Sequence, residues 1–113
     1  MESKSSIVYL YGFSLMSRDK IKSFINILKD QIEMKTEINI VLIHDGVIGT
    51  SKKGETPESL EELLLLPLNL YAIIPDIKAR GMNPSDLINK IKGIEYDDLV
   101  EILINKKKIV SWM

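Results

Sequence analysis

Short apolar segments alternate with amphipathic helical segments along the chain. Three largely apolar segments contain the β-branched or aromatic residues typical of buried strands, and they span residues 7–13, 38–43 and 68–74. A fourth strand, interrupted by Gly93, is predicted at 91–96, and a short terminal strand at 108–113. The second segment ends at a polar turn, His44-Asp45-Gly46, and the third is followed by Pro75. Because strands that alternate with helices build βαβ units, we expect a mostly parallel sheet with helices on both faces.

Three longer helices are predicted between these strands. The first begins after Ser17 as its N-cap, and its apolar residues recur at helical spacing: Ile21, Phe24, Ile25, Leu28 and Ile32. The second begins at Thr56 and Pro57 and stops at Pro67. Asp97 is expected to cap the third. The predicted inward face of that helix consists of Leu99, Val100, Leu103 and Ile104.

The loops that follow the strands are the expected place for ligands and partners, because parallel sheets bind at the carboxyl ends of their strands. These loops span residues 12–17, 44–55 and 75–84. Residues 49–57 lack hydrophobic periodicity and predict an exposed loop. Lys52 and Lys53 within it either attract an anion or are simply solvated. In the third loop, Gly81 is expected to end a helical turn in the left-handed conformation.

Composition indicates one globular domain that spans residues 1–113. Apolar residues make up 45% of the chain and charged residues 27%, and the formal net charge is -1. This balance gives no global reason to bind nucleic acid, so no direct nucleic-acid contact is expected, and Lys106-Lys107-Lys108 is the one local basic run. The polar N-terminus and the short apolar runs predict a cytoplasmic protein that does not enter the membrane.

The chain contains no cysteine, which excludes a disulfide, a thiolate metal site and a cysteine nucleophile. His44 is the only histidine, so neither a metal site nor a cofactor is expected. One hypothesis makes His44 a general base beside Asp45, as in a small hydrolase. The alternative is that Asp45 caps the following turn while His44 points into a partner or solvent. No catalytic residue is therefore assigned.

Glycine and tryptophan positions raise further alternatives. Gly46, Gly49 and Gly54 match no phosphate-binding loop, and Gly46 is expected to supply a positive φ angle in its turn. Trp112 either packs in the core or is buried in a subunit interface. Residues 63–66 are all leucine, so either both sides of this helix are covered or one side faces another chain.

Four motifs in order resemble the DsrH/TusB family of the DsrE/F/H superfamily, over roughly residues 38–113. They are the turn His44-Asp45-Gly46-Val47, the segment LYAIIPDIKARGM at 70–82, the segment IEYDDLV at 94–100, and Trp112 near the C-terminus. The resemblance implies a three-layer α/β/α domain with a mainly parallel sheet of about five strands. It also implies a place beside DsrE-like (TusD) and DsrF-like (TusC) subunits. Such assemblies pass persulfide sulfur toward tRNA 2-thiouridine synthesis or take part in sulfur oxidation.

Without a cysteine, this chain is similar to the members that do not carry sulfur. The resemblance therefore implies a non-catalytic subunit that supports the persulfide site of its partners. The candidate partner or ligand contacts are His44, Asp45, Gly46, Asp76, Arg80 and Trp112. The alternative is a self-associating small-ligand or protein-binding module of the same fold outside sulfur transfer. Pro75 and the long 49–57 loop depart from the family pattern.

Overall fold

Five parallel strands form a single sheet in the order β4-β3-β2-β1-β5. The computed structural model describes residues 5–54, 56–105 and 108–112. The strands are β1 (Ser6–Tyr11), β2 (Glu37–Leu42), β3 (Asn69–Ile73), β4 (Ile91–Ile94) and β5 (Lys108–Trp112). Every pair of neighbours is parallel, so the predicted sheet of about five strands is confirmed and contains no antiparallel pair. Lys106, Lys107 and Met113, which belong to the predicted basic run and terminal strand, lie outside the described residues.

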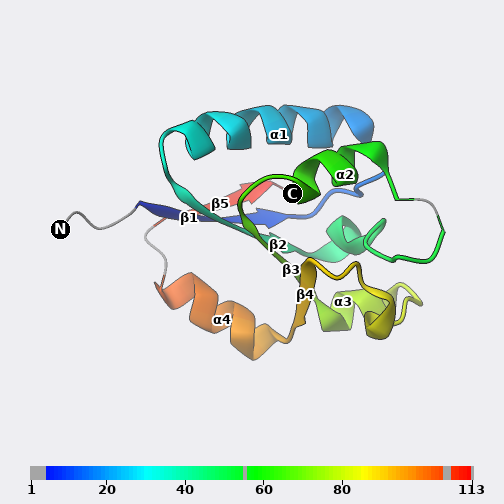
Figure 1. Ribbon diagram of the computed structural model, residues 1–113. Helices are drawn as coiled ribbons and strands as arrows, with labels where there is room; N and C mark the ends of the chain where they lie inside the picture. The colour runs from blue at the N-terminus through cyan, green and yellow to red at the C-terminus, as the bar shows by residue number, and fades with distance from the viewer. Residues whose placement is uncertain (1–4, 55, 106–107, 113) are drawn as a thin grey trace.

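Helices cover both faces of this sheet, which gives the expected three layers (Figure 1). Helices α1 (Arg18–Glu33) and α2 (Glu58–Leu64) lie on one face, and α4 (Tyr96–Asn105) lies on the other. The shorter elements are η1 (His44–Val47), α3 (Ile74–Ala79) and η2 (Pro84–Asp86). They follow β2 and β3, so they gather at the carboxyl end of the sheet. Among the described residues, no helix combines the length and hydropathy that a bilayer crossing requires.

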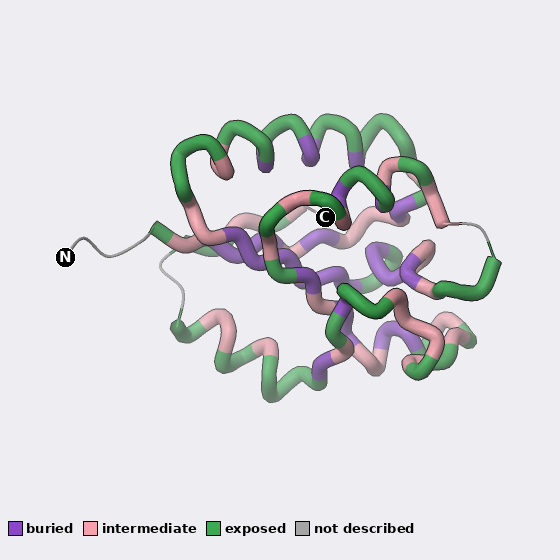
Figure 2. The backbone as a smooth tube through the Cα atoms, viewed as in Figure 1, coloured by how far each residue is buried: buried purple, intermediate pink, exposed green. Residues whose placement is uncertain are grey.

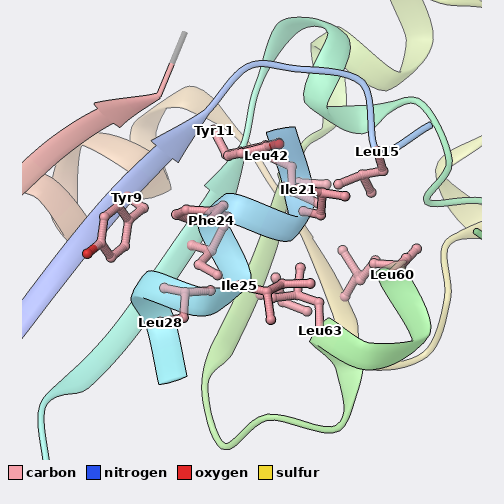
Figure 3. Close-up of a cluster of buried hydrophobic side chains, with 14 of the residues drawn as sticks. Tyr9, Tyr11, Leu15, Ile21, Phe24, Ile25, Leu28, Leu42, Leu60 and Leu63 are labelled. Atoms are coloured by element: carbon pink, nitrogen blue, oxygen red, sulfur yellow. The ribbon is translucent and has the colours of Figure 1, made fainter. Parts of the chain in front are cut away.

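The larger part of the core lies between the sheet and helices α1 and α2. Figure 2 shows the buried positions concentrated in the strands and on the inner side of α1. Phe24 of α1 packs edge-on against Tyr9 and stacks on Tyr11, with ring centroids 5.1 and 4.7 Å apart. The close-up in Figure 3 shows these three rings beside Leu28 and Leu42. The predicted apolar stripe of α1 is therefore confirmed, with Ile21, Phe24, Ile25 and Leu28 fully buried.

Helix boundaries differ from the prediction by one or two residues. Ser17 is the N-cap of α1 as expected, although its side chain makes no capping hydrogen bond. Pro57, not Thr56, is the N-cap of α2. Helix α4 already begins at Tyr96, and the carboxylate of Asp98 accepts a hydrogen bond from the Glu95 N–H at 3.1 Å. The capping role predicted for Asp97 is therefore wrong, because the carboxylate that binds the backbone is one residue later.

The predicted inward face of α4 is wrong in part. Leu99, Ile102 and Leu103 pack against the sheet. By contrast, 51% of Val100 and 75% of Ile104 are exposed. The helix carries apolar residues around most of its circumference, and only the stripe that includes Ile102 faces the strands. The all-leucine end of α2 divides similarly, because Leu63 is buried while 85% of Leu65 is exposed.

The loop after η1 is not the freely exposed segment that its composition predicts. Thr50 is fully buried, and its hydroxyl donates a hydrogen bond to the carbonyl of Val47 at 2.7 Å. Ser51 forms a β-bridge with Leu87. The Lys53 ammonium lies 3.4 Å from the carboxylate of Asp86. Backbone hydrogen bonds and this ion pair therefore attach residues 50–53 to the segment around η2.

Two core tyrosines are expected to respond in opposite ways to loss of the hydroxyl. The Tyr11 hydroxyl is buried and has no hydrogen-bond partner among the described residues, whereas the Tyr9 hydroxyl donates to Oε1 of Gln31. Tyr11→Phe is therefore expected to raise the free energy of unfolding by about 1 kcal/mol, and Tyr9→Phe to lower it by a similar amount. Urea denaturation of both variants measures this. Two variants with equal losses would contradict it.

The same Tyr11 hydroxyl predicts how stability changes with pH. Burial raises the pKa of Tyr11 to about 12 from 10.0. Between pH 10 and 12 the hydroxyl is therefore protonated in the folded state and ionised in the unfolded state. Its ionisation leaves the free energy of unfolding unchanged below pH 10 and lowers it between pH 10 and 12. The alkaline loss is expected to be smaller in Tyr11→Phe, measured by the same denaturation at increasing pH.

Candidate functional site

A cluster of residues, most of them polar, lies at the carboxyl ends of β2, β3 and β4. Its members from η1 are His44, Asp45 and Gly46. Asp76 lies in α3, Arg80 directly follows α3, and Tyr96 begins α4. We call this set the carboxyl-end cluster. It forms because parallel strands end at the same edge of the sheet, so the residues that follow them meet there.

The β2–η1 turn positions the first of these residues. After Ile43 the backbone reaches a left-handed conformation at His44, with φ at 50°. This conformation costs a residue other than glycine roughly 1 kcal/mol or more. The His44 N–H donates a 2.8 Å hydrogen bond to Oδ2 of Asp76, which lies 32 residues later in the chain. That bond ties the strained turn to α3, and the imidazole is left on the exposed side.

Asp76 is the centre of the cluster and is only 8% exposed. Its Oδ2 accepts the His44 N–H, and its Oδ1 lies 3.3 Å from the hydroxyl of Tyr96, which donates to it. A buried carboxylate is tolerated when both of its oxygens accept hydrogen bonds. Asp76 therefore joins three segments of chain, namely the turn after β2, helix α3 and the start of α4.

Arg80 and Asp45 make the more exposed half of the cluster. The guanidinium donates from Nε and Nη2 to the same carboxylate oxygen, Oδ1 of Asp45, at 3.2 and 3.0 Å. A further contact runs from Nη1 to the backbone carbonyl of Asp76 at 3.4 Å. The Arg80 side chain is 27% exposed and that of Asp45 is 64% exposed. The outermost charge of the pair is therefore the carboxylate.

Gly46 has a different role from the one that its sequence context predicts. Its φ is not among the positive values, and the left-handed residue of this turn is His44. A Cβ at position 46 would lie 2.2 Å from the carbonyl oxygen of Tyr11, which is far inside van der Waals contact. Glycine is required because η1 packs directly on the end of β1. The expectation of a positive φ at Gly46 is therefore wrong.

Five of the six predicted contact residues come together, and Trp112 does not. Its ring lies on the α1 side of the sheet, with centroids 5.0 Å from Phe24 and 6.4 Å from Tyr11. Strand β1 separates β5 from β2, whose end begins the cluster. The indole is half-buried in this aromatic stack, which agrees with packing against the core. A partner contact at Trp112 stays a prediction.

Tyr96 is the member that the sequence did not indicate as a site residue. The predicted strand at 91–96 ends at this residue, yet it lies in the first turn of α4 and is 52% exposed. Its pKa is raised above the ordinary value of 10.0, chiefly because the negative charge of Asp76 disfavours a phenolate nearby. Burial and the hydrogen bond to Asp76 act in the same direction, and Arg80 opposes them.

Removing the Asp76 charge is expected to lower the pKa of Tyr96 toward its ordinary value. Asp76→Asn keeps the shape of the side chain but removes the Coulombic repulsion that disfavours the phenolate. Titration of ¹³C-labelled tyrosine rings by NMR measures the shift. Tyr9 is the internal control, because its pKa is raised mainly by burial under α1 and not by this carboxylate. An unchanged Tyr96 titration would contradict the contact.

The contacts of Asp45 bear on both hypotheses about the polar turn after β2. The carboxylate of Asp45 binds Arg80, so it does not orient the imidazole of His44, as the hydrolase hypothesis required. It also makes no capping hydrogen bond in the following turn, which the alternative had predicted. Within the described ranges, no hydrogen bond joins the His44 ring to another side chain, and no three metal-ligating side chains gather. What the cluster does provide is a fixed, exposed surface with a carboxylate, a guanidinium, an imidazole and a phenol.

The three-layer domain with an all-parallel sheet agrees with the family comparison. A family model described as "DsrH like protein" matches residues 14–109, and the chain belongs to that family. Protein TusB of Pectobacterium parmentieri is 30% identical over 73 residues, which are 65% of this chain and 73% of that protein. Protein TusB of Serratia proteamaculans is 33% identical over 75 residues, which are 66% and 74% of the two chains.

Solved structures support the same fold over nearly the whole chain. A protein of unknown function, MTH1491 from Methanobacterium thermoautotrophicum, superposes with a TM-score of 0.77 over 96% of this chain and 99% of its own, at 14% identity. The ychN protein from E. coli superposes with a TM-score of 0.72 over 97% and 100%, at 15% identity. At these identities the likeness concerns the fold alone.

Proposed function

We propose that this chain is a non-catalytic subunit of a DsrE/F/H (TusBCD)-type sulfur-relay complex in the cytoplasm. Its partners are a DsrE-like and a DsrF-like chain, and the complex serves tRNA 2-thiouridine synthesis or sulfur oxidation. The observation that carries the proposal is a DsrH-like chain with no cysteine at all. Persulfide transfer needs a thiolate, so the sulfur must be carried on a partner's cysteine.

The carboxyl-end cluster is the proposed contact with those partners. Its carboxylate–guanidinium pair is held from both sides, because η1 presents Asp45 and the residue after α3 presents Arg80. A charged pair that is already ordered loses little side-chain entropy when a partner binds. Charged groups of this kind contribute specificity and register to an interface more than they contribute bulk affinity. The exposed ring of His44 adds an imidazole to this surface.

Exchange of the two charges tests this contact without removing the ion pair. In the double variant Asp45→Arg with Arg80→Asp, the pair can form again, but the outermost charge becomes positive. We expect the dissociation constant for the purified DsrE-like and DsrF-like partners to rise at least tenfold, measured by isothermal titration calorimetry. A tenfold change corresponds to about 1.4 kcal/mol.

The chain offers a matched control for this exchange. Lys29 of α1 and Glu62 of α2 form an ion pair at 2.7 Å, with side chains that are 50% and 49% exposed, on the opposite side of the sheet. The double variant Lys29→Glu with Glu62→Lys is expected to bind the partners normally. Equal losses in both double variants would contradict a contact at the cluster. A wild-type chain that stays monomeric beside both partners would overturn the proposed function.

A further inference from the structure

Asp76 is a buried carboxylate whose two oxygens bind two different segments of the chain. Oδ2 accepts the His44 N–H at 2.8 Å, and Oδ1 accepts the Tyr96 hydroxyl at 3.3 Å. Because only 8% of the residue is exposed, little of this carboxylate is left for another molecule to touch. Any contribution of Asp76 to the binding of a partner therefore has to pass through the two groups that it holds.

His44 is the first of these groups, and its backbone conformation depends on Asp76. A φ of 50° lies in the left-handed region, which a residue with a Cβ adopts at a cost. Such a conformation persists only where neighbouring groups hold it, and residues strained in this way cluster at functional sites. Within the described chain, Asp76 is the acceptor of the His44 N–H. This bond therefore holds the left-handed turn.

The held turn directs Asp45, the next residue. The Asp45 carbonyl accepts the Ile48 N–H at 3.0 Å, so the backbone of Asp45 is fixed in η1. Its side chain is exposed, and the two hydrogen bonds from Arg80 both end on one oxygen, Oδ1. Among the described residues, no donor reaches the other oxygen, Oδ2. Oδ2 is therefore open to a basic side chain of another protein.

Tyr96 is the second group that Asp76 holds. Its hydroxyl binds the buried carboxylate, while about half of the residue is exposed. The guanidinium of Arg80 is near enough to lower the pKa of Tyr96, so the phenol lies beside the Arg80–Asp45 pair. A tyrosine whose hydroxyl is already bonded loses little side-chain entropy on binding, and tyrosine is enriched among the residues that dominate interfaces.

We infer, on the basis of the proposed function, that Asp76 is the positioning residue of the partner contact. The groups that touch the partner are Oδ2 of Asp45 and the ring of Tyr96. The partner surface that fits them carries a basic side chain opposite Asp45 and an apolar group against the ring. Asp76 stays buried in the complex and acts through geometry, because it fixes the turn and the start of α4 relative to each other.

Two substitutions at Asp76 separate its geometry from its charge. In Asp76→Asn the carboxamide oxygen can still accept the His44 N–H, and the amide nitrogen can donate to the Tyr96 hydroxyl oxygen. Asp76→Ala removes both bonds. By isothermal titration calorimetry with the purified DsrE-like and DsrF-like partners, we expect the dissociation constant to rise about tenfold or more for Asp76→Ala and less than about threefold for Asp76→Asn. Equal losses in the two variants would overturn the positioning role.

Hydrogen exchange gives a readout of the bond itself. The His44 amide is expected to be protected in wild type and in Asp76→Asn, and to exchange faster in Asp76→Ala, because the acceptor is then missing. Circular dichroism confirms the fold of each variant. Unchanged exchange in Asp76→Ala would contradict the hold on the turn.

A glycine at position 44 tests whether the lost affinity comes from the turn. Glycine adopts positive φ about as readily as negative φ, so the turn needs the bond to Asp76 less. In a double-mutant cycle, Asp76→Ala is expected to weaken binding by a smaller factor in the His44→Gly background than in the wild-type background. The same factor in both backgrounds would show that Asp76 does not act through His44, which would overturn the proposal.

Tyr96→Ala tests the second contact group. The dissociation constant for the same partners is expected to rise about tenfold or more, as for other aromatic residues at the centre of an interface. Leu65→Ala is the matched control, because Leu65 directly follows α2 on the other face of the sheet and is also exposed. It is expected to bind the partners as wild type does. Equal affinities of the two variants would remove Tyr96 from the contact.

Failure of this role for Asp76 can be told apart from failure of the proposed function. Suppose that wild type binds both partners and the charge exchange at Asp45 and Arg80 weakens binding, whereas Asp76→Ala binds as wild type does. The positioning role is then overturned and the proposed function stands. A wild-type chain that binds neither partner overturns both.

Discussion

The Gly46→Ala variant is expected to lose about 3 kcal/mol or more of its free energy of unfolding. The added Cβ would be 2.2 Å from the carbonyl oxygen of Tyr11, and the next contact, 3.2 Å away, is the carbonyl carbon of the same residue. Both are backbone atoms, so no side chain can rotate out of the way. The Tyr11 carbonyl also accepts the Ile43 N–H at 3.0 Å, which holds it in place. Overpacking of this kind costs 1–3 kcal/mol or more.

Gly54→Ala is the control for this substitution. Among the described residues, no atom lies within 4 Å of a Cβ built at position 54, although its φ of 83° is unfavourable for alanine. We expect a loss of about 1 kcal/mol from the backbone conformation alone. Guanidinium denaturation of the two variants separates steric overlap from backbone strain. If Gly46→Ala lost no more stability than Gly54→Ala, η1 could not be packed against β1 as described.

The Phe24→Ala variant is expected to lose about 3–5 kcal/mol of its free energy of unfolding. Phe24 is fully buried and is the ring that joins Tyr9, Tyr11 and Trp112 into one stack. Truncation removes the buried ring and leaves a cavity between α1 and three strand residues that cannot all move toward it. Native domains are stable by only 5–15 kcal/mol, so this loss would remove a large fraction of the free energy of unfolding.

Phe13→Ala provides the comparison within the same aromatic group. Phe13 is only half-buried, its ring is 5.8 Å from Tyr11, and the Lys20 ammonium lies over its face at 4.0 Å. An exposed cation–π contact contributes about 0.5–1 kcal/mol, so we expect a loss below about 2 kcal/mol. Differential scanning calorimetry of the two variants measures the difference. Similar melting temperatures would show that Phe24 is not the centre of the stack.

The strands and the first helix were predictable because their apolar residues leave little choice of orientation. In α1 the apolar residues other than Ile27 form one stripe, and most of that stripe is buried. Helix α4 was harder because apolar residues occur on several of its sides. Its pattern fits a buried stripe through Val100 and Ile104 as well as one through Ile102, and only packing over the sheet decides between them. Periodicity alone contains no such information.

The meeting of the cluster residues at one edge of the sheet was predictable, but their contacts were not. The polar turn after β2 and the loop after β3 had to meet at the carboxyl edge of a parallel sheet, which brought Asp45 and Arg80 together. The hydrogen bond from Tyr96 to Asp76 depends on where α4 begins relative to α3, and no local pattern specifies that. The prediction for Gly46 was wrong because a glycine in a turn usually indicates a positive φ angle. Here the constraint is the backbone of Tyr11, which leaves no room for a Cβ.

The pairing of β1 with β5 has a consequence for how the chain folds during synthesis. Ile7 pairs with Lys108, so the first described strand needs the last one to complete its hydrogen bonds. Strands β1 to β4 leave the ribosome earlier and can pair in chain order, while the far edge of β1 stays open. Contacts between such distant segments also slow folding. The nascent chain therefore has a period in which Tyr9 and Tyr11 border an unpaired edge, and β5 ends that period.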